Sequence, residues 1–134
     1  MNKLELAWET FEFHLASSAD NESKLHENIN VFMDSLAGEP SDPIEESERK
    51  IRIKNVNNLN KLISCSNELI NDYKKQNASL KDLTSLYKSY AEKGTPIPDG
   101  REVSIMTLNE LRNTNATMIE QLNIQRDEFK SLLG

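Results

Sequence analysis

Residues 44–93 contain neither glycine nor proline, the two residues that most often interrupt a helix. At the start of this stretch Pro43 suits the first helical position, and the Asp42 carboxylate can accept hydrogen bonds from unpaired backbone N–H groups. At its end stands Gly94, which takes the left-handed conformation after a helix without steric cost. The sequence therefore predicts one helix over residues 43–93, roughly 75 Å long at ~1.5 Å per residue, too long for a compact globule.

The segments on either side repeat apolar residues in alternating steps of four and three, the spacing of one stripe along a helix. The first stripe comprises Leu4, Trp8, Phe11, Leu15, Ser18, Glu22, Leu25, Ile29, Phe32 and Leu36. The last comprises Leu108, Leu111, Asn115, Met118, Leu122, Gln125, Phe129 and Leu132. We expect helices over residues 3–37 and 105–133, with a bend or break left open at 17–21. The third helix has a capping box from Thr107 to Glu110, and a start at residue 105 is the alternative.

The long middle helix carries two neighbouring apolar rows. One row comprises Val56, Leu59, Ile63, Ser66, Ile70, Tyr73, Asn77 and Leu80 and continues to Tyr87. The second comprises Leu62, Leu69, Leu83 and Tyr90. A two-helix hairpin covers one stripe per helix, so the second row requires a further neighbour. The earlier pair Ile44 and Ile51 is out of phase with these rows, which predicts a register shift near residues 52–55.

Glycine and proline cluster at residues 38–40 and 94–100, so the chain is expected to turn back twice. The predicted fold is all-α: three long helices in an elongated antiparallel hairpin or bundle with coiled-coil character, as a single domain over residues 1–134. A content of 37% hydrophobic and 28% charged residues suits narrow apolar stripes better than a thick globular core. From lengths of roughly 50, 75 and 40 Å, we expect the outer helices to overlap only near the middle of the long one.

Charge is unevenly distributed along the chain, whose formal net charge is -6. Residues 1–48 hold 12 acids and 2 bases, a net of -10, while residues 49–134 hold 14 bases and 10 acids, a net of +4. This asymmetry predicts antiparallel packing of the first segment against the second, or attraction of a basic partner, with a solvated acidic face as the alternative. The basic stretch 49–54 is expected to face acidic helices. Binding of nucleic acid by this stretch is disfavoured, because the chain is acidic overall.

The residues that carry catalysis or bind metals are few. His14, His26 and Cys65 are the only histidines and cysteine, and no Gly-rich phosphate loop is present. Glu22 and His26 are one turn apart, but the Glu-x-x-His pattern that di-iron bundles place on two helices is absent. The sequence predicts a protein that is not an enzyme, with no catalytic residues, cofactor or metal.

A single cysteine excludes an internal disulfide and is typical of a reducing compartment. No apolar run approaches the roughly 20 residues that cross a bilayer, and the first residues lack the core of a signal peptide. We therefore expect a protein of the nucleus or cytoplasm that does not insert into membranes.

Apolar residues exceed what three such helices are expected to cover. Leu6 and Phe13 lie off the first stripe, and aromatic residues often anchor protein interfaces. The candidate interface residues are Leu6, Trp8, Phe11, Phe13, Leu62, Leu69, Leu83 and Tyr90. Packing inside the chain is the alternative for the same residues. Polar residues within the stripes either fix the register of packing or mark exposed stretches.

The function that these patterns favour is that of a structural or adaptor subunit of a hetero-oligomeric helical complex, bound to partner helices through its apolar stripes. In architecture the chain is similar to small coiled-coil subunits of eukaryotic kinetochore, Mediator or vesicle-tethering complexes, a similarity that rests on no motif. A regulatory helical bundle of a membrane-fusion or trafficking protein and a self-sufficient homodimeric coiled coil are the alternatives.

Overall fold

The computed structural model describes the backbone of residues 2–35 and 44–133, and the side chains of residues 2–34 and 56–133. This part of the chain forms three helices: α1 (Lys3–Ser35), α2 (Ile44–Lys93) and α3 (Ile105–Leu132). The predicted all-α fold is confirmed, and no strand occurs in the described backbone.

The helix ends at Lys3, Lys93 and Ile105 are those that the sequence predicts. The predicted cap at Asp42, the first turn at 38–40 and the end of the first helix at 37 lie outside the described residues. The same is true of the side chains in the basic stretch 49–54 and of the predicted register shift at 52–55.

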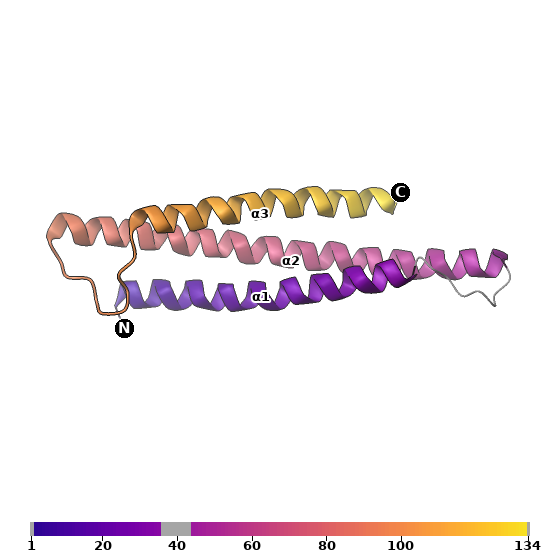
Figure 1. Cartoon of the computed structure of the whole chain (residues 1–134), viewed down its shortest axis with the longest axis horizontal. Coiled ribbons are helices and arrows are strands. Elements are labelled where there is room, and N and C mark those ends of the chain that lie inside the picture. Colours follow the sequence, from indigo (N-terminus) through magenta and orange to yellow (C-terminus); the bar gives the residue numbers. More distant parts are fainter. Residues whose placement is uncertain (1, 36–43, 134) are drawn as a thin grey trace.

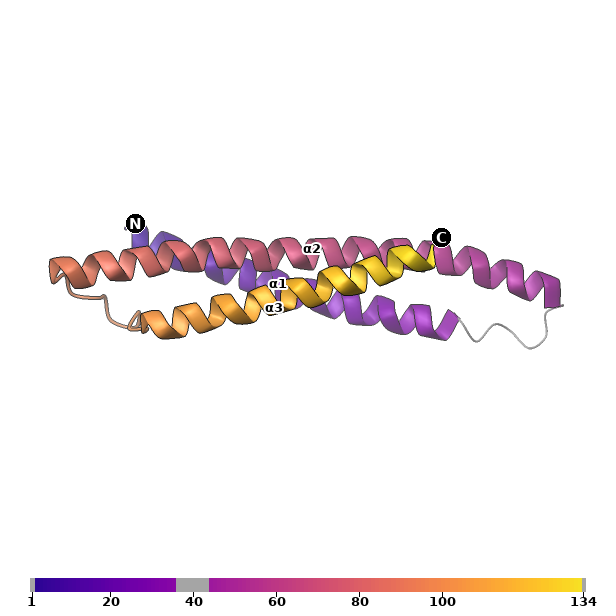
Figure 2. The same cartoon turned by 90° about the horizontal axis from the view of Figure 1, so that it is seen from above.

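In the view of Figure 1 the long helix α2 lies between the other two, and α1 and α3 both run antiparallel to it. Seen from above, α1 and α3 cross each other along one side of α2 (Figure 2). The expected overlap of α1 and α3 near the middle of α2 alone is wrong. The two helices lie level with each other over most of their length, because the connection over residues 94–104 runs back along the rod before α3 begins (Figure 1). The prediction used helix lengths alone, and these lengths do not show at which level of α2 the helix α3 begins.

Helix α1 is continuous through residues 17–21, where the sequence left a break open. The Ser18 hydroxyl donates a hydrogen bond to the Leu15 carbonyl oxygen at 2.8 Å, a bond that is compatible with an unbroken helix. Asp20 does not begin a new helix, and its carboxylate lies 3.2 Å from the ammonium group of Lys24, one turn later. The polar residues are therefore accommodated within one helix.

Both ends of the connection between α2 and α3 are capped. Gly94 has φ 66°, its N–H donates to the Ala91 carbonyl at 3.3 Å, and the Thr95 N–H donates to the Tyr90 carbonyl at 2.9 Å, which together form a Schellman motif. At the start of α3 the Ser104 hydroxyl accepts from the Thr107 N–H at 3.1 Å. The predicted capping box at Thr107 is wrong, since Ser104 is the N-cap and the alternative start at residue 105 is correct.

Two apolar clusters form the core. One comprises Leu25, Leu59, Leu62, Leu69, Ile70, Tyr73 and Leu122. The other comprises Leu4, Phe11, Leu80, Leu83, Tyr87 and Leu108. Each cluster draws on all three helices, which requires that α1 and α3 lie level along α2. The two rows predicted on α2 therefore have two covering helices.

We predict that Gly94→Ala lowers the free energy of unfolding by about 1 kcal/mol, because a side chain is disfavoured at the positive φ of this cap. Gly94→Asn is expected to cost less, since asparagine tolerates this conformation better than alanine. Urea unfolding followed by circular dichroism measures both variants. Equal stability of Gly94→Ala and the parent chain would show that the glycine is not needed at this cap.

Candidate partner-binding surfaces

Helices α1 and α3 each pack on α2, while the backbones of α1 and α3 stay apart from each other. Among the described residues, no Cα atom of α1 lies within 8 Å of a Cα atom of α3. Helices in direct contact have axes 8–10 Å apart, so the space between α1 and α3 is wider than a packed interface. The three helices thus form an open arrangement along one side of the rod.

A groove occupies this open side. It has a volume of about 300 Å³, and its lining comprises Glu22, Leu25, His26 and Ile29 of α1, Leu69 of α2, and Met118, Gln121, Leu122 and Gln125 of α3. Leu25, Leu69 and Leu122 belong to the buried core and form an apolar floor. Ile29 and Met118 are half-buried against the same cluster, so the apolar lining continues up both walls.

Residues seven apart lie on the same face of a packed helix, so the walls of the groove can be followed along the rod. On α1, Leu15 lies one heptad before Glu22 and two before Ile29. On α3, Leu111 and Leu132 share the heptad row of Met118 and Gln125. The exposed fractions of these three leucines are 49% for Leu15, 39% for Leu111 and 64% for Leu132. The predicted stripe residues that remain exposed therefore belong to the face of each helix that borders the groove.

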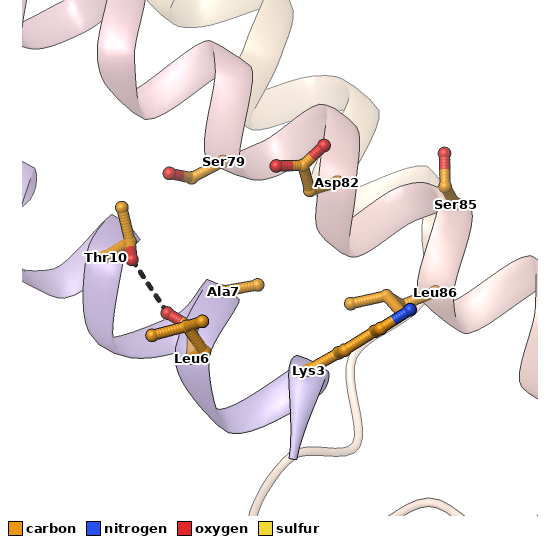
Figure 3. Close-up of a pocket in the computed structure, with 8 residues that line it drawn as sticks. All are labelled: Lys3, Leu6, Ala7, Thr10, Ser79, Asp82, Ser85 and Leu86. Carbon is orange, nitrogen blue, oxygen red and sulfur yellow. Dashed lines mark hydrogen bonds between the residues drawn. The ribbon is translucent and has the colours of Figure 1, made fainter. Parts of the chain in front are cut away.

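A second apolar surface lies along the other edge of α1. Leu6 is 57% exposed and Phe13 is 70% exposed. Leu6 borders a cleft of about 400 Å³ between α1 and α2, which is lined by Lys3, Leu6, Ala7, Thr10, Ser79, Asp82, Ser85 and Leu86 (Figure 3). The side chains of Leu6, Ala7 and Leu86 give this cleft its apolar part, and Lys3 and Asp82 lie on opposite walls (Figure 3). We call Leu6, Phe13 and this cleft the outer edge of α1.

Arg101 fastens the connection before α3 to the start of α1. Its guanidinium group contacts both carboxylate oxygens of Glu5 at 3.3 Å and one oxygen of Glu12 at 3.0 Å. The same group lies 5.2 Å from the centre of the Trp8 ring. The hydrogen bonds to Glu5 and Glu12 hold the pKa of Arg101 above its ordinary value. This contact with Arg101 holds the Trp8 side chain against another residue of the same chain.

A buried polar layer separates the two apolar clusters. The Gln76 amide nitrogen donates to the Ser18 hydroxyl at 2.8 Å and to the His14 carbonyl at 3.0 Å. The Gln76 carbonyl oxygen accepts from the Asn115 amide at 3.1 Å. The exposed fractions of Gln76, Ser18 and Asn115 are 1%, 4% and 9%. One side chain of α2 therefore joins all three helices by hydrogen bonds.

A neighbouring contact adds to the polar seam between α1 and α2. The buried Asp72 carboxylate accepts from the Ser17 hydroxyl at 3.0 Å and from the Asn21 amide at 2.6 Å. Two polar residues of the predicted stripes, Ser18 and Asn115, therefore form hydrogen bonds that fix the packing of the helices. Glu22 is exposed at the edge of the groove, and Gln125 lines the groove and is half-buried.

Sequence analysis missed Gln76, although a signal was present. The row Leu62, Leu69, Leu83 and Tyr90 advances by seven residues except for one step of fourteen, and the skipped position is Gln76. A polar residue at the empty position of a heptad row is a candidate for a buried hydrogen-bonding residue. Its partners Ser18 and Asn115 were already noted as polar members of their stripes.

The candidate interface residues divide into three groups by their burial. Leu62, Leu69, Leu83 and Phe11 are buried in the core clusters. Trp8 and Tyr90 are half-buried against the second cluster. Leu6 and Phe13 are exposed, and the buried Leu69 also lies at the floor of the groove.

The few residues that suit catalysis or metal binding are spread apart. His26 Nε2 lies 3.8 Å from a carboxylate oxygen of Glu22, and both side chains are substantially exposed. The Cys65 sulfur accepts from the Asn28 amide at 3.4 Å and packs against the first cluster. Among the described residues, no three of His, Cys, Asp and Glu are grouped closely enough to hold a metal ion. In that same part of the chain, no helix has the length and apolarity needed to cross a membrane.

Comparisons with protein-family models, curated proteins and solved structures find no significant match to this chain.

We predict that Gln76→Leu lowers the free energy of unfolding by about 2 kcal/mol, because Ser18 and Asn115 then lose a partner inside the core. The triple variant Ser18→Ala, Gln76→Leu, Asn115→Leu is expected to recover most of this loss, since it leaves no unpaired donor among the three. Urea unfolding of both proteins provides the comparison. If Gln76→Leu has the same free energy of unfolding as the parent chain, the hydrogen bonds of this layer do not contribute to stability.

Alkaline pH is expected to weaken the fold through Tyr87. Burial raises the pKa of its hydroxyl, while the hydrogen bond from Trp8 acts in the opposite direction. The unfolded chain loses this proton near pH ~10 whereas the native chain retains it, so the native state binds more protons and stability falls as pH rises above that value. The neutral hydroxyl is also needed to donate to the Arg101 carbonyl.

Melting temperatures measured from about pH 9 to about pH 11 test this linkage. The parent chain should lose stability more steeply over this range than Tyr87→Phe, which has no proton to lose. Tyr73, whose pKa burial also raises, is present in both proteins and cancels in the comparison. Parallel profiles for the two proteins would exclude Tyr87 as the group responsible.

Proposed function

We propose that this chain is a non-enzymatic adaptor or structural subunit of a hetero-oligomeric helical complex. It binds partner helices in coiled-coil fashion through apolar stripes that its own helices do not cover. In architecture the chain is similar to small coiled-coil subunits of eukaryotic kinetochore, Mediator or tethering complexes, and the compartment that we propose is the nucleus or cytoplasm.

The observation that supports this proposal is that apolar side chains on both sides of α1 are exposed. Phe13 is 70% exposed at the outer edge, and Leu15 is 49% exposed beside the groove. Leaving a leucine or phenylalanine in water forgoes roughly 1.5–3 kcal/mol relative to its full burial. Because the net stability of a domain is ~5–15 kcal/mol, covering several such residues with a partner would change its stability substantially.

The chain also has what a scaffold requires, namely an internally specified structure. The polar layer around Gln76 fixes how the three helices align, and Arg101 fixes the connection to α1. A partner can therefore meet surfaces that are already positioned, which reduces the entropy lost on binding. This favours an adaptor over a chain that folds only when bound.

The outer edge of α1 provides the direct test. We predict that Phe13→Glu reduces capture of partner proteins from the native source at least about fivefold, because burial of a new charge opposes binding. Circular dichroism of the variant should be unchanged, since the Phe13 side chain lies outside the core. Ser23→Glu is the matched control, since it adds the same charge at an exposed position of α1.

Sedimentation of the purified chain supplies the complementary measurement. A monomer agrees with the proposal. So does a chain whose exposed apolar residues are only partly covered, provided that it binds a foreign subunit. A stable homodimer that captures no other protein would instead identify the self-sufficient coiled coil. Undiminished capture by Phe13→Glu would exclude this residue from the interface.

A further inference from the structure

We infer that the groove between α1 and α3 binds one amphipathic helix of a different protein, and that this helix carries Lys or Arg beside its apolar stripe at the level of Glu22. The inference rests on the proposed adaptor function and goes beyond it, because it assigns the place, the number of helices and the chemistry of the partner.

The packing of the three helices defines the space for one more helix. Both α1 and α3 contact α2 while no Cα atoms of α1 and α3 approach within 8 Å of each other in the described residues. In a four-helix bundle, two helices that share a neighbour without touching are those on opposite corners. The position across from α2, in contact with both α1 and α3, is the one that the described residues leave unfilled.

Apolar residues continue the two walls of the groove beyond its lining. The lining itself runs from Glu22 to Ile29 on α1 and from Met118 to Gln125 on α3, about 10 Å each at ~1.5 Å per residue. With the exposed leucines in the same heptad rows, Leu15 on α1 and Leu111 and Leu132 on α3, the rows extend over about 21 Å and about 31 Å. A partner helix of about 14 to 20 residues matches these lengths. The floor at Leu69 is already in the core, so an apolar stripe laid over it would extend an existing cluster.

The charges of the walls select the partner. Helix α1 as a whole holds 7 acids and 2 bases, and α3 holds 4 acids and 3 bases, so both helices are net negative. Among the residues that line the groove, Glu22 is the acid and the residues of α3 are uncharged. Helix α2, which packs between them on the opposite corner, holds 7 acids and 10 bases. The occupant of the groove has the same two neighbours as α2, so the same complementarity favours a basic helix.

Glu22 places the preference for a basic residue at one level of the groove. It occupies an apolar heptad row between Leu15 and Ile29 and lines the groove, and one carboxylate oxygen lies 3.8 Å from His26 Nε2. A carboxylate inside an apolar row disfavours a partner that is apolar or acidic at this level. A Lys or Arg on the incoming helix would instead pair with it.

A second copy of this chain is a poorer occupant. Two grooves facing one another would meet wall against wall, which brings Glu22 toward its counterpart and leaves the hollow unfilled. The buried apolar rows of α2 are not available to enter the groove of another copy. One free helix from another protein fills the space without either problem.

A photo-crosslinking amino acid at Gln121 of the full chain, expressed in its native source, tests the inference. Gln121 lines the groove and is exposed, so the probe can be placed without disturbing the core. We expect crosslinks to a segment of another protein with apolar residues at heptad spacing and with Lys or Arg beside them. Crosslinks to a second copy, to a segment without that pattern, or to no protein would overturn the inference.

The same probe at Phe13 distinguishes the two proposals. Partner capture at Phe13 without capture at Gln121 would leave the adaptor function standing and remove the groove as a binding site. Capture at neither position would refute both the adaptor function and the groove as a binding site.

Charge reversal tests the role of Glu22. Glu22→Lys should reduce crosslinking at Gln121 at least about threefold, and Glu22→Gln should reduce it less, because only the former repels a basic helix. Glu9→Lys is the matched control, since Glu9 is exposed on α1 and does not line the groove. Equal losses in Glu22→Lys and Glu9→Lys would refute a specific contact at Glu22.

Discussion

The unbroken length of α2 is the constraint on which the rest of the structure depends. Its 50 residues form a rod whose two apolar rows cannot both be covered by a single antiparallel helix. The chain meets this requirement by placing α1 and α3 on neighbouring faces of α2 (Figure 2). Each outer helix packs on α2, and apolar side chains of both border the space between them. The open groove therefore follows from the length of one helix and the number of its apolar rows.

Alignment along such a rod requires more than apolar contacts, since a stripe of leucines packs similarly after a shift of one heptad. The hydrogen bonds of Gln76 to Ser18 and Asn115 can form at one alignment only, which makes a shifted arrangement leave buried polar groups unpaired. Arg101 adds a second fixed point at one end of the rod, through Glu5 and Glu12. One polar fixed point at Glu5 and Glu12 and another at Ser18 thus position α1 relative to the rest of the chain.

Local rules were sufficient for the helices themselves. The Gly94 cap, the absence of Gly and Pro before it and the heptad stripes predicted the number of helices and most of their described ends. The same rules misplaced the cap of α3, because Ser104 and Thr107 both suit that role and the choice depends on where the connection enters. They also underestimated the overlap of α1 and α3, since the path of residues 94–104 depends on the contact of Arg101 with α1. Burial of Leu62, Leu69 and Leu83 and exposure of Phe13 depend on which face each helix turns inward, and this is a tertiary property.

The parallel course of α1 and α3 has an electrostatic consequence. The backbone dipoles of these two helices point the same way along the rod, and the dipole of α2 points against both. The amino-terminal ends of α1 and α3 therefore lie together near the carboxyl-terminal half of α2 (Figure 1). A fourth helix running in the direction of α2 would restore an alternating, antiparallel set of neighbours, whereas one running the opposite way would leave three dipoles aligned. The topology of the chain thus favours one polarity for whatever helix completes the bundle.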